Sequence, residues 1–249
     1  MKPELASWAR AMLRIGLIVA IASAAVLAIS GPGNRFGWWN YREAFSLMGV
    51  AAWSGAVGAM LCVPPAIVAA RAGTRRALAL AVVGVVAGAL TLSLPWLFRQ
   101  RAHGVPPIHD ISTDTEHPPR FVAIVPLRKD APNTLEYAGV ELARAQKQGY
   151  PDIAPLTLAV DPAAAFEQCL RAARAQGWDI VAAVPEELRI EATDTTPFFG
   201  FKDDVVVRIT PAGGGSLVDV RSVSRVGRSD LGKNAERIRA FLRALGKPS

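Results

Sequence analysis

Two long stretches without a charged residue constrain this chain more than any other feature. Residues 44–70 and 77–98 contain no Asp, Glu, Lys or Arg. A helix of about 20 mostly apolar residues is long enough to cross the hydrocarbon layer of a bilayer. We therefore predict transmembrane helices over 44–70 and 77–98, and a further one over 12–31, which together make a bundle of three.

The first of these segments allows two interpretations. Lys2, Arg10 and Arg14 precede an apolar run that is rich in small residues, which is also the pattern of a cleaved signal peptide. Two further hydrophobic spans follow, and no clear cleavage site stands out. These observations favour a retained transmembrane helix over a cleaved signal peptide.

Positive charges beside the spans predict their orientation, because cytoplasmic loops carry an excess of Lys and Arg. The two sides differ modestly, with Lys2, Arg10, Arg14, Arg71, Arg75 and Arg76 on one and Arg35, Arg42, Arg99 and Arg101 on the other. We expect a multi-pass protein of a bacterial inner (cytoplasmic) membrane. Its N-terminus would lie in the cytoplasm, and the chain after Phe98 would lie in the periplasm.

The net charge of +7 comes from the membrane part alone. Residues 1–102 hold ten Lys or Arg and two Asp or Glu, whereas residues 103–249 hold eighteen and nineteen. A nucleic-acid-binding domain carries a basic surface of its own, so we predict no nucleic-acid partner. The C-terminal segment 221–247 is basic and the segment 186–204 is acidic, so we expect internal charge pairing between them. In the alternative, exposed basic residues of the last helix could meet anionic lipid head groups: Arg237, Arg239 and Arg243.

Small residues recur at helical spacing inside the spans. Gly84 and Gly88 form a GxxxG pattern, and Ala51, Gly55 and Ala59 repeat the same spacing. Such faces let helices approach closely, either within one bundle or between two copies of a chain. We expect packing within one bundle, with a homo-oligomer as the alternative.

Residues 103–120 are interpreted as a polar tether between the membrane part (1–102) and a periplasmic domain over 121–249. The tether contains side chains of the types that bind metals, namely His109, Asp110, Asp114, Glu116 and His117. Their spacing matches no common zinc pattern such as HExxH, and the segment has the composition of a loop. We therefore predict neither a metal nor another cofactor.

The periplasmic part shows strand and helix signals in a regular order. Asp161 and Pro162 mark the start of a helix that Gly177 ends, and a last amphipathic helix begins near Ser229 or Asp230. Strands are predicted at 156–160, 178–184, 188–194, 203–210 and 216–225. A further short strand is predicted at 121–125, and part of a helix within 133–148.

From residue 156 onward the order is strand, helix, four strands, helix. Consecutive short strands joined by turns predict an antiparallel sheet, with both helices on one face. The predicted fold class is therefore α+β. The TATA-binding protein and the helix-grip lipid-binding proteins share this order of elements, which is an analogy of fold and not of function.

Several stretches of the periplasmic part resemble a known family: PPIHDISTDTEHPPRF, YPDIAPL, GWDIVA, DTTPFFGFKDDVVVRI and VDVRSVSRVGRSDLGKNAERIRAF. They resemble the domain-of-unknown-function family 1499 (DUF1499), here in a membrane-anchored bacterial form, over roughly Val105 to Leu245. Some relatives begin with a cysteine-serine motif where this chain has HDISTD, so no role for that cysteine carries over. The resemblance implies a domain and no particular reaction.

The last two strands predict where the polar residues lie. The apolar residues of both strands lie on the same face of the sheet only if Ile209 lies opposite Val218. Asp203 and Asp204 then point to opposite faces and are not a paired acid and base. Asp203 ends the core-facing row, where a buried carboxylate needs polar partners. We predict a polar network, either structural or a ligand site, with the candidate members Thr193, Asp194, Asp203, Ser222, Ser224, Arg225, Asp230 and Asn234.

Aromatic residues lie in the loop before the first of these two strands. Phe198, Phe199 and Phe201 surround Gly200, and Trp178 begins a neighbouring strand. These side chains would form a mobile lid over an apolar ligand, or they would simply close the end of the core.

These features favour a non-enzymatic periplasmic binding or envelope-interaction module at the lipid bilayer, with a lipid or other apolar molecule as the candidate ligand. The alternative is a carboxylate-dependent hydrolase at the membrane surface that uses Asp203 or Asp230. No nucleophile elbow or phosphate loop occurs in the periplasmic part, and histidine is absent after His117. The sequence therefore favours binding over catalysis.

Overall fold

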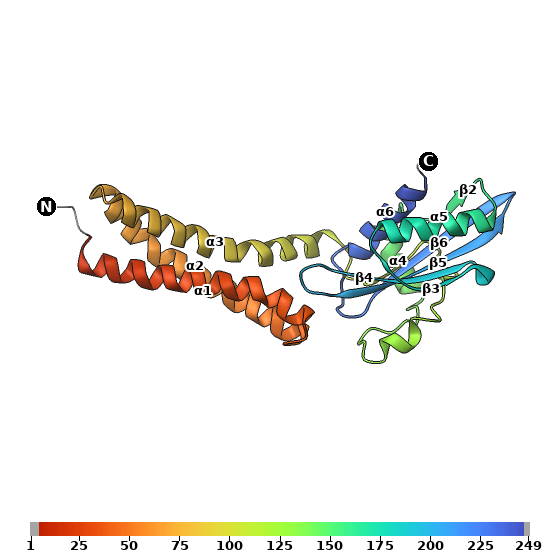
Figure 1. The fold of residues 1–249 in the computed structure, drawn as a ribbon, viewed down its shortest axis with the longest axis horizontal. Coiled ribbons are helices and arrows are strands. Elements are labelled where there is room, and N and C mark those ends of the chain that lie inside the picture. Colours follow the sequence, from red (N-terminus) through yellow and green to blue (C-terminus); the bar gives the residue numbers. More distant parts are fainter. Residues whose placement is uncertain (1–4, 247–249) are drawn as a thin grey trace. The chain divides into compact units, whose positions relative to one another are not determined.

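A computed structural model describes residues 5–246 of the protein (Figure 1). The chain forms two compact units. One is built from the chain up to Gln100 together with Phe198–Gly200, and the other from Arg101–Pro197 and the chain from Phe201 onward. The first unit is helical, and the second contains a β-sheet.

Three long helices dominate the first unit: α1 (Ser7–Arg35), α2 (Tyr41–Arg71) and α3 (Arg75–Gly104). Each is long and apolar enough to cross a membrane. The three predicted helices are therefore confirmed, with additional turns at their ends. A capping box begins α2, because the Asn40 side chain accepts hydrogen bonds from the amides of Arg42 and Glu43, and Glu43 accepts one from the Asn40 amide.

Glycines allow close packing between these helices. A Cβ atom added to Gly58 in α2 would lie only 2.7 Å from the backbone nitrogen of Ala20 in α1. Gly84 of α3 faces Cys62 of α2, and Gly88 faces the Gly55 carbonyl. The GxxxG face of α3 therefore packs within the bundle, which is the arrangement that the small-residue spacing favours.

The second unit is an antiparallel sheet with helices. Its strands are β1 (Asp110–Ser112), β2 (Leu156–Leu158), β3 (Asp179–Val184), β4 (Arg189–Thr195), β5 (Lys202–Ala212) and β6 (Gly215–Ser224). The strand order is β1-β6-β5-β4-β3, and β2 also pairs with β6. Its helices are α4 (Val140–Gly149), α5 (Pro162–Ala175) and α6 (Lys233–Leu245), with short 3-10 helices η1 (Val125–Arg128) and η2 (Pro185–Glu187). The predicted α+β class and the order from residue 156 onward are confirmed.

The main core lies between the sheet and helices α5 and α6. Asp161 caps α5 by accepting hydrogen bonds from the amides of Ala163 and Ala164. Phe166 of α5 and Phe241 of α6 are almost fully buried, and the Phe241 ring stacks on Trp178 with a centroid distance of 5.0 Å. Side chains from these helices fill the space above the sheet with apolar contacts.

The opposite face of the sheet is covered by an irregular segment, residues 113–138, which we name the cover segment. Figure 1 shows it on the side of the sheet away from α5 and α6. Phe121 and Ile124 of this segment pack on Val206 and Val223 of the sheet in a small second core. The outer face of the sheet is therefore buried as well.

Two expectations for the start of this unit were wrong. Residues 121–125 form turns leading into η1 and not a strand, because Glu191 of β4 binds the backbone amides that a strand partner would need. The expected tether contains β1, in which Asp110 pairs with Val223 of β6. Three residues carry too little periodicity to signal a strand in a sequence.

The predicted register of the last two strands is confirmed. Ile209 lies opposite Val218, and Asp203 lies opposite Ser224. Gly213 and Gly214 form the turn with φ angles of 54° and 84°, a left-handed conformation that hairpin turns require and that glycine adopts easily. The turn thus holds the register that places the charged residues of both strands.

Candidate functional site

Polar side chains gather on both faces of the sheet. Asp203 and Asp204 are adjacent in β5 and point to opposite faces, because side chains alternate along a strand. Asp203 faces α6, and Asp204 faces the cover segment. We call the two groups the helix-side network and the cover-side network.

Arg237 of α6 is the centre of the helix-side network. Its guanidinium lies 2.7 Å from the Asp203 carboxylate and 2.7 Å from the Asp194 carboxylate. Burial would lower the pKa of Arg237, but the two carboxylates outweigh it and raise the pKa. The expected pairing of the basic C-terminal segment with the acidic segment 186–204 is therefore confirmed at Arg237. The alternative of an exposed Arg237 is wrong, because its side chain is only 5% exposed.

Asn234 connects α6 to β6 in the same network. Its side-chain oxygen accepts hydrogen bonds from the Ser222 hydroxyl at 2.6 Å and from Arg237 at 2.6 Å. Its side-chain nitrogen donates to the Ser224 hydroxyl and to the His109 carbonyl. This network ties the last helix to the end of the sheet.

Asp230 lies just before α6 and binds its first turn. The carboxylate accepts hydrogen bonds from the amides of Gly232 and Asn234, at 2.9 and 2.7 Å. Burial raises the pKa of Asp230, and these two backbone hydrogen bonds only partly oppose that rise. Asp230 therefore supports the helix start, as helix N-termini favour an acidic partner.

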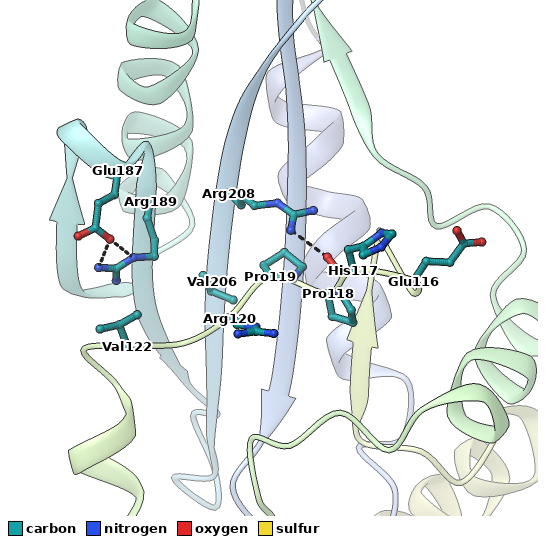
Figure 2. A pocket seen from close by; sticks show the side chains of 10 residues that line it. All are labelled: Glu116, His117, Pro118, Pro119, Arg120, Val122, Glu187, Arg189, Val206 and Arg208. Carbon is teal, nitrogen blue, oxygen red and sulfur yellow. Dashed lines mark hydrogen bonds and ion pairs between the residues drawn. The ribbon is translucent and has the colours of Figure 1, made fainter.

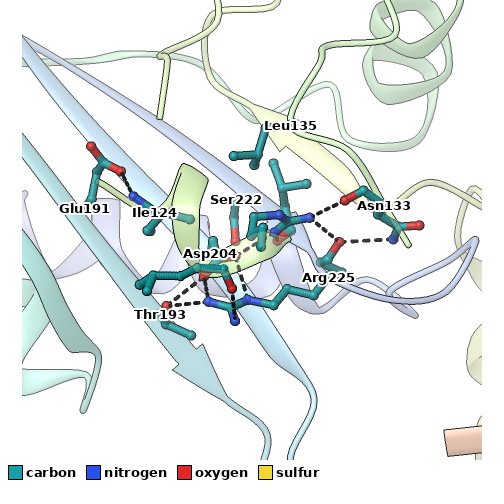
Figure 3. A network of polar contacts seen from close by, with 12 residues as sticks. Ile124, Asn133, Leu135, Glu191, Thr193, Asp204, Ser222 and Arg225 are labelled. Carbon is teal, nitrogen blue, oxygen red and sulfur yellow. Dashed lines mark hydrogen bonds and ion pairs between the residues drawn. The ribbon is translucent and has the colours of Figure 1, made fainter. Parts of the chain in front are cut away.

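Asp204 is the centre of the cover-side network (Figure 3). It pairs with Arg128 at 2.6 Å and with Arg225 at 2.9 Å, and it accepts a hydrogen bond from the Thr193 hydroxyl. Burial would raise the pKa of Asp204, but the hydrogen bonds from Arg225, Thr193 and Arg128 outweigh it and lower the pKa. The carboxylate is fully buried and charged.

Glu191 of β4 holds the cover segment by its backbone. Its carboxylate accepts hydrogen bonds from the amides of Val122, Ala123 and Ile124, and it pairs with Arg189. Its side chain is fully buried. One carboxylate thus satisfies three backbone donors that would otherwise be buried without partners.

Arg221 of β6 makes a further buried ion pair on this face. Two of its nitrogens bind both oxygens of Asp110, at 3.0 and 2.7 Å. The guanidinium also lies near two aromatic rings, 5.6 Å from the centroid of Phe121 and 5.3 Å from that of Tyr137. Burial raises the pKa of Tyr137 to about 12, so its hydroxyl stays neutral.

Two acidic residues of the expected tether, Asp110 and Asp114, serve the sheet as ion-pair partners. Asp114 binds Arg208 at 2.9 Å, and Asp219 binds the same guanidinium at 2.8 Å. Asp114 also accepts hydrogen bonds from the amides of Glu116 and His117. Among residues 5–246, no group of three or more His, Cys, Asp or Glu side chains is placed to hold a metal ion.

A pocket of about 430 Å³ opens between the cover segment and the sheet (Figure 2). Val206 of β5 lies at its floor, and Pro118, Pro119 and Val122 of the cover segment add apolar walls. The rest of the lining is charged or polar: Glu116, His117, Arg120, Glu187, Arg189 and Arg208. The pocket therefore combines an apolar interior with a rim that carries both signs of charge.

The arginines of this rim differ in whether they already form ion pairs within the chain. Arg189 and Arg208 lie directly opposite each other on neighbouring strands, and each is bound to two carboxylates. Arg120 is exposed and belongs to none of the ion pairs formed within the described chain. Arg120 is therefore the rim cation that can bind a ligand without first breaking an internal pair.

Comparison with known families now identifies the second unit. A family model described as "Protein of unknown function (DUF1499)" matches residues 110–245, more than half of the chain. The chain belongs to the DUF1499 family. Neither the curated proteins nor the solved structures contain a significant match. The resemblance seen in the sequence is confirmed, and the matched range begins with β1 and ends with α6.

The DUF1499 domain brings together part of the predicted network. Five of the predicted residues lie on the helix side, where the side chains of Arg237 and Asn234 connect them: Asp194, Asp203, Ser222, Ser224 and Asn234. The hydroxyl of Thr193 and the guanidinium of Arg225 instead join Asp204 on the cover side. The predicted set therefore divides between the two faces of the sheet.

The aromatic candidates also separate. Trp178 belongs to the core between the sheet and α5–α6, and Phe198, Phe199 and Phe201 do not. Phe198 and Phe199 pack edge to face with a centroid distance of 4.9 Å and belong to the first unit. The pocket described above lies on the cover side, away from the core that contains Trp178.

The sequence alone did not predict the roles of several important residues, above all Arg128, Glu191 and the pocket arginines. The sequence did contain one signal of a covered second face, because Val206 and Val223 are apolar residues on the face that was expected to meet solvent. Apolar residues on both faces of a strand indicate that both faces are covered. The partner of Arg128 lies 76 positions away in sequence, a separation that no local pattern encodes.

Proposed function

We propose that this chain is an integral membrane protein whose DUF1499 domain lies outside the cytoplasm and binds an amphiphilic ligand, such as a lipid, without transforming it. The supporting observation is the pocket on the cover side of the sheet. The proposed binding surface consists of Arg120, Val122, Val206 and the adjacent prolines.

The pocket chemistry supports an amphiphile. A volume of about 430 Å³ lies near the lower end of the range for small-molecule sites, which suits a head group and the first part of a chain. An anionic group, such as a phosphate, would bind Arg120, because a guanidinium matches phosphate geometry. An amine on the same head group would be attracted to Glu187 or Glu116 on the rim.

The state of the carboxylates favours binding over the hydrolase alternative. Asp203, Asp204 and Glu191 each form a buried ion pair with arginine. Asp230 is bound by two backbone amides. A general acid or base must exchange a proton with the substrate, and these carboxylates are already committed to structural partners.

The membrane setting rests on two observations. Three helices of the chain are long and apolar enough to cross a membrane. The positive residues beside them favour a cytoplasmic N-terminus, which would place the DUF1499 domain in the periplasm. Alkaline phosphatase fused after Ser249 should then be active in intact cells. An inactive phosphatase fusion, with an active cytoplasmic reporter at the same point, would contradict this orientation.

Photo-cross-linking tests the pocket directly. The full chain is reconstituted with a photoactivatable phosphatidylethanolamine that carries its reactive group near the head, and cross-linked peptides are mapped by mass spectrometry. We expect cross-links within residues 116–122. Arg120→Glu should reduce them by about fivefold or more, since loss of a charge-assisted contact costs on the order of 1 kcal/mol or more.

Arg144→Glu is the matched control for this experiment. Arg144 is also an exposed arginine of the DUF1499 domain, with 63% of its side chain exposed, but it does not line the pocket. Its reversal should leave the cross-links unchanged. Cross-links confined to the helical unit, or an equal loss in both variants, would overturn the pocket proposal.

A further inference from the structure

The cover segment exposes several large aliphatic side chains side by side in sequence. Val122, Val125 and Leu127 are 56%, 52% and 53% exposed, and Pro126 between them is exposed too. We name residues 122–127 the apolar knuckle. A cluster of exposed apolar residues on a folded domain usually marks an interaction surface.

The knuckle is held rigidly from beneath. Glu191 binds its first three amides, and Arg225 donates a hydrogen bond to the Leu127 carbonyl at 3.1 Å. Ile124 in its middle is fully buried against the sheet. The backbone that carries the outward side chains is therefore ordered before any partner binds, which lowers the entropic cost of binding.

Charged residues flank the knuckle at both ends. Arg120 and Lys129 are exposed, one on each side, and Asp130 is the exposed acidic residue that follows. Basic residues beside an apolar surface suit a bilayer with anionic lipids. Arg120 and Val122 also line the pocket, so the knuckle and the mouth of the pocket share one surface (Figure 2).

We propose that the apolar knuckle docks onto the surface of an anionic phospholipid bilayer. Val125, Leu127 and Val122 would enter the region between head groups and acyl chains, and Arg120 and Lys129 would meet lipid phosphates. A chain with three membrane-capable helices keeps its domain at a high local concentration of bilayer, so a weak contact suffices. Docking rests on the proposed membrane setting, and it shares Arg120 and Val122 with the proposed pocket surface.

Site-specific quenching tests this docking in the full chain. Both native cysteines are buried, so a bimane label can be attached to Val125→Cys. The labelled protein is placed in nanodiscs that contain phosphatidylglycerol and lipids with a nitroxide on the upper acyl chain. We expect quenching by about twofold or more at position 125, since interfacial residues reach the acyl boundary.

Val140→Cys provides the matched control position. Val140 is an even more exposed valine, at 73%, but it begins α4 beside the acidic Glu141. Its label should show little quenching. Equal quenching at both positions, or none at position 125, would overturn the proposal.

Charge and apolar variants separate docking from pocket binding. Adding Lys129→Glu to Val125→Cys should lower quenching in phosphatidylglycerol nanodiscs, and should have little effect in nanodiscs of phosphatidylcholine alone. Leu127→Asp should abolish docking and leave thermal unfolding unchanged, because the side chain is exposed. Head-group cross-links that persist at residues 116–122 in Leu127→Asp would uphold the pocket and show that docking is separate. Quenching that persists in Leu127→Asp would overturn the role of the knuckle.

Discussion

The two faces of the DUF1499 sheet are buried with different proportions of apolar and charged contacts. On the helix side, Val205, Val207 and Ile209 of β5 pack against apolar residues of α5 and α6. On the cover side, the same strand contributes Asp204 and Arg208, and their neighbours are ion pairs. Apolar burial is insensitive to protonation, whereas buried ion pairs depend on every partner remaining charged. The comparison shows that polar alternation in a strand does not by itself indicate a solvent-exposed face.

The largest effect that would test this contrast is expected from Asp204→Ala. The substitution leaves Arg128 and Arg225 facing each other in a buried site without their carboxylate. Breaking a buried pair in this way costs about 3–5 kcal/mol. Native-state hydrogen exchange of β5 and β6 amides in the full chain should show this loss of unfolding free energy. An unchanged exchange rate would mean that the cover side does not stabilise the sheet.

The adjacent substitution Asp203→Ala sharpens the comparison. Arg237 loses one carboxylate but keeps Asp194, and it keeps its hydrogen bond to Asn234. We therefore expect a smaller destabilisation, about 1–3 kcal/mol, in the same exchange measurement. Destabilisation equal to that of Asp204→Ala would remove the distinction between the two networks.

Acidification should weaken the cover side. The pKa values of Asp204 and Asp114 are lowered in the folded state by their arginine partners and hydrogen bonds, which outweigh burial. Their contribution to stability is therefore complete above the ordinary aspartate pKa of about 3.9 and is lost as pH falls below it. Exchange of cover-segment amides should accelerate in that range, and the difference between Asp204→Ala and the unsubstituted chain should shrink. A difference that grows on acidification would contradict this sign.

The smallest effect is expected from Arg239→Ala. Arg239 pairs with Asp152 at 2.6 Å, but both side chains are substantially exposed, at 32% and 55%. Pairs of this kind contribute about 0.2–1 kcal/mol because water and salt screen them. The same exchange measurement at raised salt should show almost no difference from the unsubstituted chain. A loss of unfolding free energy as large as that of Asp203→Ala would show that the exposure of an ion pair does not determine its contribution to stability.

The sequence predicted the parts of the molecule that repeat a simple pattern. The length of the uncharged stretches predicted helices α1–α3. The alternation of apolar and polar residues predicted strands β4–β6, together with the pairing of Ile209 with Val218. The position of Asp203 opposite Ser224 was predicted from that register, but its side-chain partner Arg237 was not. The choice between a structural network and a ligand site stays a prediction for those residues.

The cover segment could not be predicted in the same way. Its conformation depends on single side chains of distant strands, such as Glu191 binding three of its amides. Pro118, Pro119 and Pro126 exclude regular periodicity, and the segment's own apolar residues match a short strand. The pocket is formed by this segment and two strands, so local sequence patterns could not predict it either.

The pairing of the first strand with the last has a consequence for folding. Asp110 of β1 meets Val223 of β6, so almost the whole domain lies between the two partners. Such contacts close only after a long loop has been ordered, and high contact order slows folding. The cover segment, although it comes early in the chain, has no surface to pack on until β4, β5 and β6 are present. The DUF1499 domain is therefore expected to fold as one late cooperative step, and a nascent chain that stops short of Ser224 should remain open to proteases.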